Sequence, residues 1–168
     1  MKKLYRLLSN INTVLEKAET FVGSACLGVL FVVMIVNAAL RYLFRSGLNW
    51  SDELNGFLFV WFGLLAAAYS MSRNNHLNIT AVINLVPAGL KYALATVMNC
   101  IMIVMFVIYM PALGKLLNTL PKSNVMRVPL KYVYYILPLC FGLMTWHCVF
   151  NIIRDSVRFF TGGKEEQV

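Results

Sequence analysis

Four long apolar stretches dominate the pattern of hydrophobic and polar positions along the chain. No charged residue falls within residues 20–40, 54–72, 92–114 or 132–153. Each stretch is about as long as the roughly 20 helical residues that cross the hydrocarbon core of a bilayer. None alternates polar with apolar residues as a barrel strand would, and lipid offers no partner for free backbone groups. The pattern therefore predicts an all-α membrane protein with four transmembrane helices.

The segment before the first stretch is amphipathic. Its leucines and isoleucine recur at helical spacing, and its lysines, arginine and asparagines fall between them. This pattern predicts an interfacial N-terminal helix whose basic end lies near lipid headgroups, the alternative being a frayed lead-in. The predicted single membrane domain is then an arm at 1–19, spans at about 20–40, 51–72, 91–113 and 131–153, and a cytoplasmic tail at 154–168.

Composition supports a membrane protein and narrows its partners. Of 168 residues, 60% are hydrophobic and 13% are charged, whereas a soluble domain carries about 25% charged residues. The net charge of +8 arises from residues at span ends, where cations meet lipid headgroups, so we expect membrane lipids and no nucleic acid as partners. The four cysteines lie inside spans without Cys-x-x-Cys spacing, which indicates packing residues and not disulfides or a metal site.

The distribution of lysine and arginine predicts the orientation. The two termini and the 73–91 connection carry nine, and the 41–50 turn and the 115–131 connection carry six. Cytoplasmic segments are enriched in these cations, so both termini are expected in the cytoplasm. The first span begins too late for a cleaved signal peptide, and we interpret it as a retained helix.

An acidic junction precedes the second span. Asp52 and Glu53 follow Trp50 and Ser51 at the mouth of an otherwise apolar segment. In one interpretation, Ser51 caps the helix and the two acids lie in its first turn, where the helix dipole favours negative charge. In the other, Asp52 or Glu53 pairs with Arg41 or Arg45 across a short turn.

Single residues inside the other spans suggest helix packing. Asn37 is expected to bond a neighbouring helix, and Trp61 shares a face with Phe57 while Gly63 begins a slimmer patch. Pro138 should kink the fourth span unless a neighbour satisfies the freed carbonyl. His76 is expected to be a hydrogen-bonded loop residue. The basic 115–131 connection either contacts a partner protein or is a solvated loop.

The motifs of common enzymes are missing from the sequence. It contains no phosphate-binding glycine loop, nucleophile elbow or zinc-type cluster, so we expect no enzyme activity. Only His147 is placed inside a span, whereas haem in a helical bundle usually needs a pair of histidines. Asp52 and Glu53 are interpreted as the only acids near a span, and no internal repeat suggests a transporter on its own. We expect a helper subunit; a redox membrane protein and a stand-alone small exporter are the alternatives.

Several of these residues occur in the order found in a known family. Arg41-Tyr42 closes span one, and Trp50 with Asp52-Glu53 opens span two. An aromatic run, 57–62, then leads to Gly63. The later positions of the set are Arg73, His76, Arg127-Val128-Pro129 and Tyr132. Over nearly the whole chain this set resembles the small, DctQ-like membrane subunit of tripartite ATP-independent periplasmic (TRAP) transporters. One departure is visible, because Asn78 and Thr80 stand where many relatives carry an acidic residue.

The resemblance implies a role within a bacterial inner-membrane complex. A large TRAP membrane subunit would hold the substrate and sodium sites and move them by an elevator-type motion, so this chain would need no cofactor of its own. A periplasmic substrate-binding protein would deliver an organic acid, either a C4-dicarboxylate or, by general likeness, a sialic acid. The small subunit would widen the static scaffold and help the binding protein dock. The expected interface or junction residues are Arg41, Tyr42, Arg45, Trp50, Asp52, Glu53, Trp61, Gly63, Arg73, His76 and Arg127.

Overall fold

The computed structural model describes residues 2–73 and 88–160. Within these residues it contains the helices α1 (Lys2–Phe44), α2 (Ser51–Ser72), α4 (Ala88–Thr119), α5 (Leu130–Tyr134) and α6 (Ile136–Phe160). Four helical segments are long and apolar enough to cross a membrane, namely Tyr5–Phe44, Ser51–Ser72, Leu94–Thr119 and Leu130–Val157. The predicted fold class is thereby confirmed. His76 and the end of the tail lie outside the described residues.

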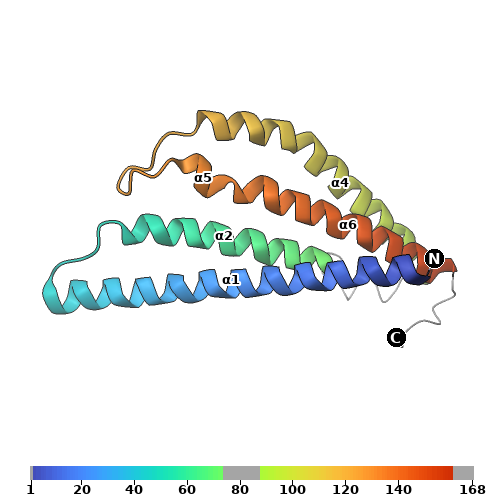
Figure 1. Cartoon of the computed structure of the whole chain (residues 1–168), viewed down its shortest axis with the longest axis horizontal. Coiled ribbons are helices and arrows are strands. Elements are labelled where there is room, and N and C mark those ends of the chain that lie inside the picture. The colour runs from blue at the N-terminus through green and yellow to red at the C-terminus, as the bar shows by residue number, and fades with distance from the viewer. Residues whose placement is uncertain (1, 74–87, 161–168) are drawn as a thin grey trace.

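The helices form two hairpins that are joined at one end. α1 pairs with α2, α4 pairs with α6, and α6 also packs against α2. The hairpins converge where the N-terminus lies and diverge toward the α1–α2 and α4–α5 loops (Figure 1). α4 continues through Pro111 as a bowed helix. The convergent end therefore brings together residues that are far apart in the sequence.

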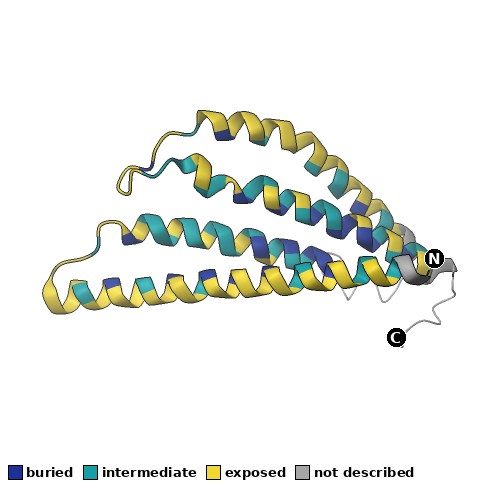
Figure 2. Cartoon of the chain, viewed as in Figure 1, coloured by how far each residue is buried: buried dark blue, intermediate teal, exposed yellow. Residues whose placement is uncertain are grey.

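α1 is one helix of 43 residues, so the arm and the first span are continuous. A line of buried and half-buried positions recurs along it at alternating steps of three and four residues, as in the seam of a coiled coil. The seam consists of Asn12, Glu16, Glu19, Gly23, Cys26, Leu30, Val33 and Asn37. Figure 2 shows this line of low exposure along the edge of α1 that faces α2. A Cβ atom on Gly23 would lie 3.7 Å from Leu65 Cβ, so this small residue lets the two helices approach closely.

The α1–α2 turn is closed by backbone geometry and by Asn37. Arg45 adopts a left-handed φ of 51°, and Ser46 N–H donates to Leu40 O at 3.4 Å, so a backbone bond that reaches back six residues closes the end of α1. Asn37 Oδ1 accepts a hydrogen bond from Leu48 N at 2.8 Å. The partner of Asn37 is therefore the loop backbone and not a neighbouring helix. A Cβ atom on Gly47 would lie 2.8 Å from Arg41 Cγ, so the Arg41 side chain would have to move to admit a side chain there.

The predicted cap of α2 by Ser51 is wrong. Trp50 occupies the cap position in a helical conformation, without a side-chain hydrogen bond to the helix. The hydroxyl of Ser51 donates instead to Leu48 O at 2.7 Å, and this side chain is fully buried. Asp52 and Glu53 do lie in the first turn of α2, where the helix dipole favours their charge.

The last span is interrupted near Pro138. α5 ends at Tyr134 and α6 begins at Ile136. Pro138, four residues after Tyr134, has no N–H to donate to the carbonyl of Tyr134. The indole nitrogen of Trp61 donates to Val133 O at 2.8 Å. This bond joins α2 to α5 and satisfies a carbonyl beside the interruption.

We predict that Trp61→Phe destabilises the fold by about 1–3 kcal/mol, because Val133 O loses its side-chain donor while the ring packing is kept. Reversible unfolding in mixed detergent micelles would measure this change. Trp50→Phe is the matched control, since Trp50 is 39% exposed, and it should change stability by less than about 0.5 kcal/mol. Equal effects of the two variants would contradict the role assigned to Trp61.

Candidate functional site: a buried polar cluster and an anchored loop

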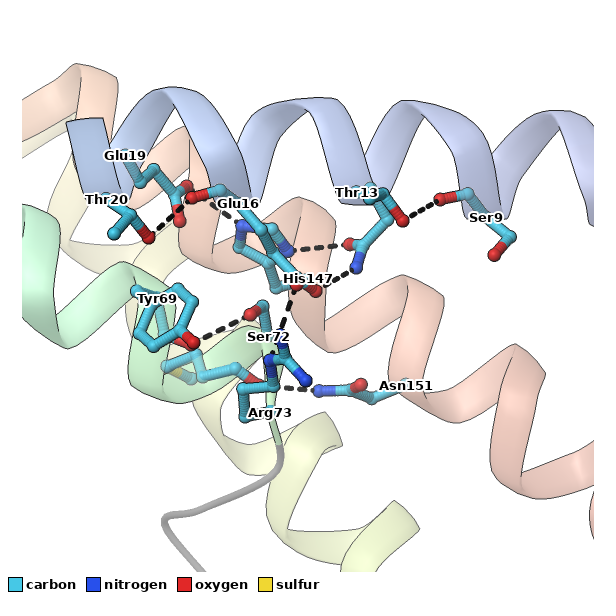
Figure 3. Close-up of polar contacts among 12 residues, drawn as sticks. Ser9, Thr13, Glu16, Glu19, Thr20, Tyr69, Ser72, Arg73, His147 and Asn151 are labelled. Atoms are coloured by element: carbon cyan, nitrogen blue, oxygen red, sulfur yellow. Dashed lines mark hydrogen bonds and ion pairs between the residues drawn. The ribbon is translucent and has the colours of Figure 1, made fainter. Parts of the chain in front are cut away.

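Two polar stripes meet at the convergent end of the helices. His147, Asn151 and Asp155 recur every four residues on one face of α6, and each is at most 3% exposed. The facing stripe of α1 is the polar start of its seam, formed by Asn12, Glu16 and Glu19. Figure 3 shows the side chains of Glu16 and Glu19 directed from α1 toward His147. We call these six residues, together with Arg73, the polar cluster.

His147 is the centre of the polar cluster. Its Nδ1 lies 2.8 Å from Asn12 Oδ1, and its Nε2 lies 2.9 Å from Glu19 Oε1. Asn12 Nδ2 donates to Glu16 Oε1 at 2.7 Å, and Glu16 Oε2 lies 3.4 Å from Arg73 Nε. A continuous path of polar contacts therefore runs from α6 through α1 to the end of α2.

Asn151 makes a second link between α6 and α2. Its Nδ2 donates to Met71 O at 2.8 Å, a carbonyl in the last turn of α2 that also accepts from the backbone N–H of Arg73. The guanidinium carbon of Arg73, the next position after that helix, lies 5.6 Å from the ring centre of Tyr69. α1, α2 and α6 are thus held together by side chains from each of them.

The sequence interpretation missed the acids of the polar cluster. Asp52 and Glu53 were expected to be the only acids near a span, which is wrong because Glu19 and Asp155 are buried among the spanning helices. Arg73 was a predicted site residue, but its partner Glu16 was not identified. The sequence does contain a signal for these acids, because the polar residues of both stripes recur at helical spacing.

The contacts of His147 do not favour redox chemistry. Both ring nitrogens already face protein oxygens, so an iron ligand role would require one hydrogen bond to break. The four cysteines are free; three are buried and Cys100 is exposed. Within residues 2–73 and 88–160, no group of three or more metal-binding side chains gathers. What the polar cluster does in this structure is join helices.

At the other end of the helices, Glu53 holds the α4–α5 loop. The loop is a short hairpin in which Ser123 N donates to Val128 O at 2.8 Å. The carboxylate of Glu53 accepts hydrogen bonds from Asn124 N at 3.0 Å and Met126 N at 2.8 Å. No ion pair joins Asp52 or Glu53 to Arg41 or Arg45, all four of which the structure describes. The second interpretation of the acidic junction therefore gives way to a carboxylate that anchors a loop.

Several of the remaining predicted site residues lie on the surface. Arg127 lies on the anchored hairpin, exposed and with a left-handed φ of 54°. Tyr42, which is 89% exposed, and Trp50 lie on the surface near the α1–α2 turn. Gly63 is exposed, and a Cβ atom there would meet nothing within 4 Å. The structure thus joins Glu53, Trp61 and Arg73 to other elements and leaves Tyr42, Trp50 and Gly63 outward.

Comparison with known proteins connects these features to a family. A family model described as "Tripartite ATP-independent periplasmic transporters, DctQ component" matches residues 30–158. A Vibrio cholerae protein described as "C4-dicarboxylate TRAP transporter small permease protein DctQ" is 30% identical over 95 residues, which are 55% of this chain and 41% of that protein. A Haemophilus influenzae protein, "Putative TRAP transporter small permease protein", is 29% identical over 73 residues, 44% of this chain and 45% of that one.

A longer relative aligns over more of the chain. The Haemophilus influenzae "Sialic acid TRAP transporter permease protein SiaT" is 24% identical over 152 residues, which are 89% of this chain and 24% of that protein. The aligned part covers less than half the length of each of these three curated relatives.

We predict that Glu53→Ala speeds amide hydrogen exchange at Asn124 and Met126 several-fold, because both amides lose their acceptor. Exchange measured on the full chain in lipid nanodiscs would test this. Asp52→Ala is the matched control, since the neighbouring acid has no recorded bond to the loop. Unchanged exchange at both amides in the Glu53 variant would contradict the anchoring role.

Proposed function

Because the chain belongs to the family of the DctQ component of tripartite ATP-independent periplasmic transporters, we propose that it is a scaffold subunit of such a transporter. In this role it supports a large permease subunit in the bacterial inner membrane. It also helps a periplasmic substrate-binding protein to dock. The transport itself, driven by sodium, takes place in the large subunit.

The observation that carries the proposal is the inverted polarity of the helices. The polar side chains of the cluster bond to one another inside, whereas the outer faces of α1 and α4 are apolar. Phe21, Val32 and Ile35 on α1 are 76%, 61% and 66% exposed, and Val107 and Ile108 on α4 are 60% and 65% exposed. Such outer faces suit lipid and the helices of another membrane protein. The polar groups of the cluster bond mainly between helices, which suits a scaffold better than a solute pathway.

The longer relative supports a membrane partner. In the "Sialic acid TRAP transporter permease protein SiaT", the segment similar to this chain is covalently continuous with the larger remainder of the protein. We infer that this chain binds, as a separate subunit, a permease that corresponds to that remainder. Sodium, which we expect to bind in the permease, is then not a ligand of this chain.

The anchored hairpin supports a contact with a soluble partner. The excess of lysine and arginine near the termini favours a cytoplasmic position for both termini, and in this orientation the α4–α5 loop faces the periplasm. Lys122 and Arg127 give this loop positive charge, and Glu53 fixes its shape. An ordered, basic loop on that side offers an acidic patch of the binding protein a complementary surface.

The substrate class follows from the relatives alone. Their names specify a C4-dicarboxylate in one case and sialic acid in another. We propose that the complex transports an organic acid of one of these two kinds. We expect the other subunits to choose between them, since the polar cluster of this chain joins helices.

Purification of the tagged chain from its native membranes tests the scaffold role. A large multi-span permease should co-purify, and uptake into liposomes should need both membrane proteins, the binding protein and a sodium gradient. Sodium-driven uptake or efflux by the purified chain alone would contradict the proposal and support the stand-alone exporter. A haem absorbance band in the pure chain would support the redox alternative.

We predict that Arg127→Glu weakens docking of the binding protein by about two- to fivefold, as expected for an exposed charge pair, and that added salt reduces this difference. Surface plasmon resonance with the membrane complex in nanodiscs would measure the affinity. Arg127→Lys should bind almost normally. Arg127→Gly removes the charge while allowing the left-handed backbone, so it separates charge from loop shape; normal docking of both the Gly and Glu variants would contradict this role.

A further inference from the structure

The hydrogen-bond directions around His147 can be assigned one after another. Glu16 lies against Arg73, so its carboxylate is an acceptor, and Asn12 directs its amide nitrogen to it at 2.7 Å. Asn12 must therefore present its carbonyl oxygen to His147 Nδ1, 2.8 Å away. Two acceptors cannot bond each other, so Nδ1 carries a hydrogen.

The second ring nitrogen then fixes the number of protons. His147 Nε2 lies 2.9 Å from Glu19 Oε1. A bare imidazole nitrogen and an ionised carboxylate are both acceptors, so one hydrogen must lie between them. The pair is either an imidazolium with a carboxylate or a neutral imidazole with a carboxylic acid. We propose that Glu19 and His147 form a binding site for one proton, which makes the pair electrically neutral.

Burial explains why the proton stays. The side chains of His147 and Glu19 are 0% and 2% exposed, and without the shared proton the pair would carry a buried negative charge that is costly to desolvate. Glu19 Oε2 is buried and has no hydrogen-bond partner among the residues that the structure describes. A buried oxygen without a hydrogen bond destabilises an ionised carboxylate more than a neutral carboxylic acid. The proton is therefore favoured on Oε1 of Glu19.

The neighbouring charges do not replace the proton. Glu16 of α1 and Arg73 after α2 compensate each other, as do Arg154 and Asp155 of α6, whose closest charged atoms are 3.7 Å apart. Lys17 of α1 is exposed to the surroundings. Lys115 of α4 lies toward the opposite end of that helix, and Cys140 of α6 is a neutral thiol. No unpaired cation among these groups faces the pair closely enough to hold it without the proton.

The proton site gives the contact between α1 and α6 a pH dependence. Folding brings a proton to a pair that would hold fewer protons when separated at neutral pH, so the contact is most stable while the proton is bound. As the pH rises until the proton is lost, a negative charge is left in the seam. The first turns of α1 should then separate from α6, while the α1–α2 turn stays closed.

Nuclear magnetic resonance of the full chain in nanodiscs, labelled with nitrogen isotope only in histidine, tests the proton count. The chain has two histidines, so His147→Gln assigns the signals and His76 serves as the internal reference. We expect a hydrogen on Nδ1 of His147 and one proton shared between its Nε2 and Glu19. A bare Nδ1, or a pair without the shared proton, would overturn the proposal.

The Glu19→Gln variant tests whether the proton, and not the contact between α1 and α6 itself, causes the pH dependence. A glutamine amide can donate to the bare Nε2 without a titrating group, so the variant should keep the seam closed at alkaline pH. Amide exchange at residues 10–20 should speed up with pH beyond the intrinsic rate in the wild type and in Glu16→Gln, but not in Glu19→Gln. The same alkaline opening in Glu19→Gln as in the wild type would overturn the proposal, whether or not the scaffold function holds.

Discussion

A polar side chain that is shielded from water must find its partner within the protein, and this constraint determines how the two helical hairpins meet. Glu19 of α1 and His147 of α6 are separated by 128 residues in the sequence and lie 2.9 Å apart. Either one alone at this depth would be an unsatisfied polar group costing several kcal/mol. Asn12 and Glu16 extend the same contact along α1, and Arg73 brings in the end of α2. The convergence of the helices at this end follows from the need to pair these groups.

The divergent ends of the hairpins are connected by a different kind of contact. There, single side chains of α2 bind backbone groups of the second hairpin: Glu53 accepts from Asn124 and Met126, and Trp61 donates to Val133. Such bonds hold a loop in one shape. One end of the molecule is thus a packed polar junction, and the other presents an ordered basic loop. This division of roles is what the proposed scaffold and docking functions require of one small chain.

The sequence was sufficient for the features that depend on local composition. Charge-free runs of more than 18 residues predict spanning helices because hydrocarbon excludes unpaired backbone and charge, and the structure contains four such helices. Trp61, Glu53 and Arg73 were also identified as residues of interest. Their partners were not, because Val133, Asn124 and Glu16 are distant in sequence and no periodicity connects them. Ser51 was misassigned because a serine before a helix can bond forward or back, and only the tight turn at Gly47 decides between them.

Glu16 and Glu19 were overlooked for a physical reason. In an amphipathic segment, polar residues are expected to face water, but here they face the neighbouring helices while Leu7 and Val14, 60% and 64% exposed, face outward. The central claim is that this inward polar face holds α1 to α6. A double-mutant cycle of Glu19→Ala and His147→Ala, measured by reversible unfolding in micelles, tests it most directly. We expect a coupling free energy between about 0.5 and 3 kcal/mol; effects that simply add would contradict the claim.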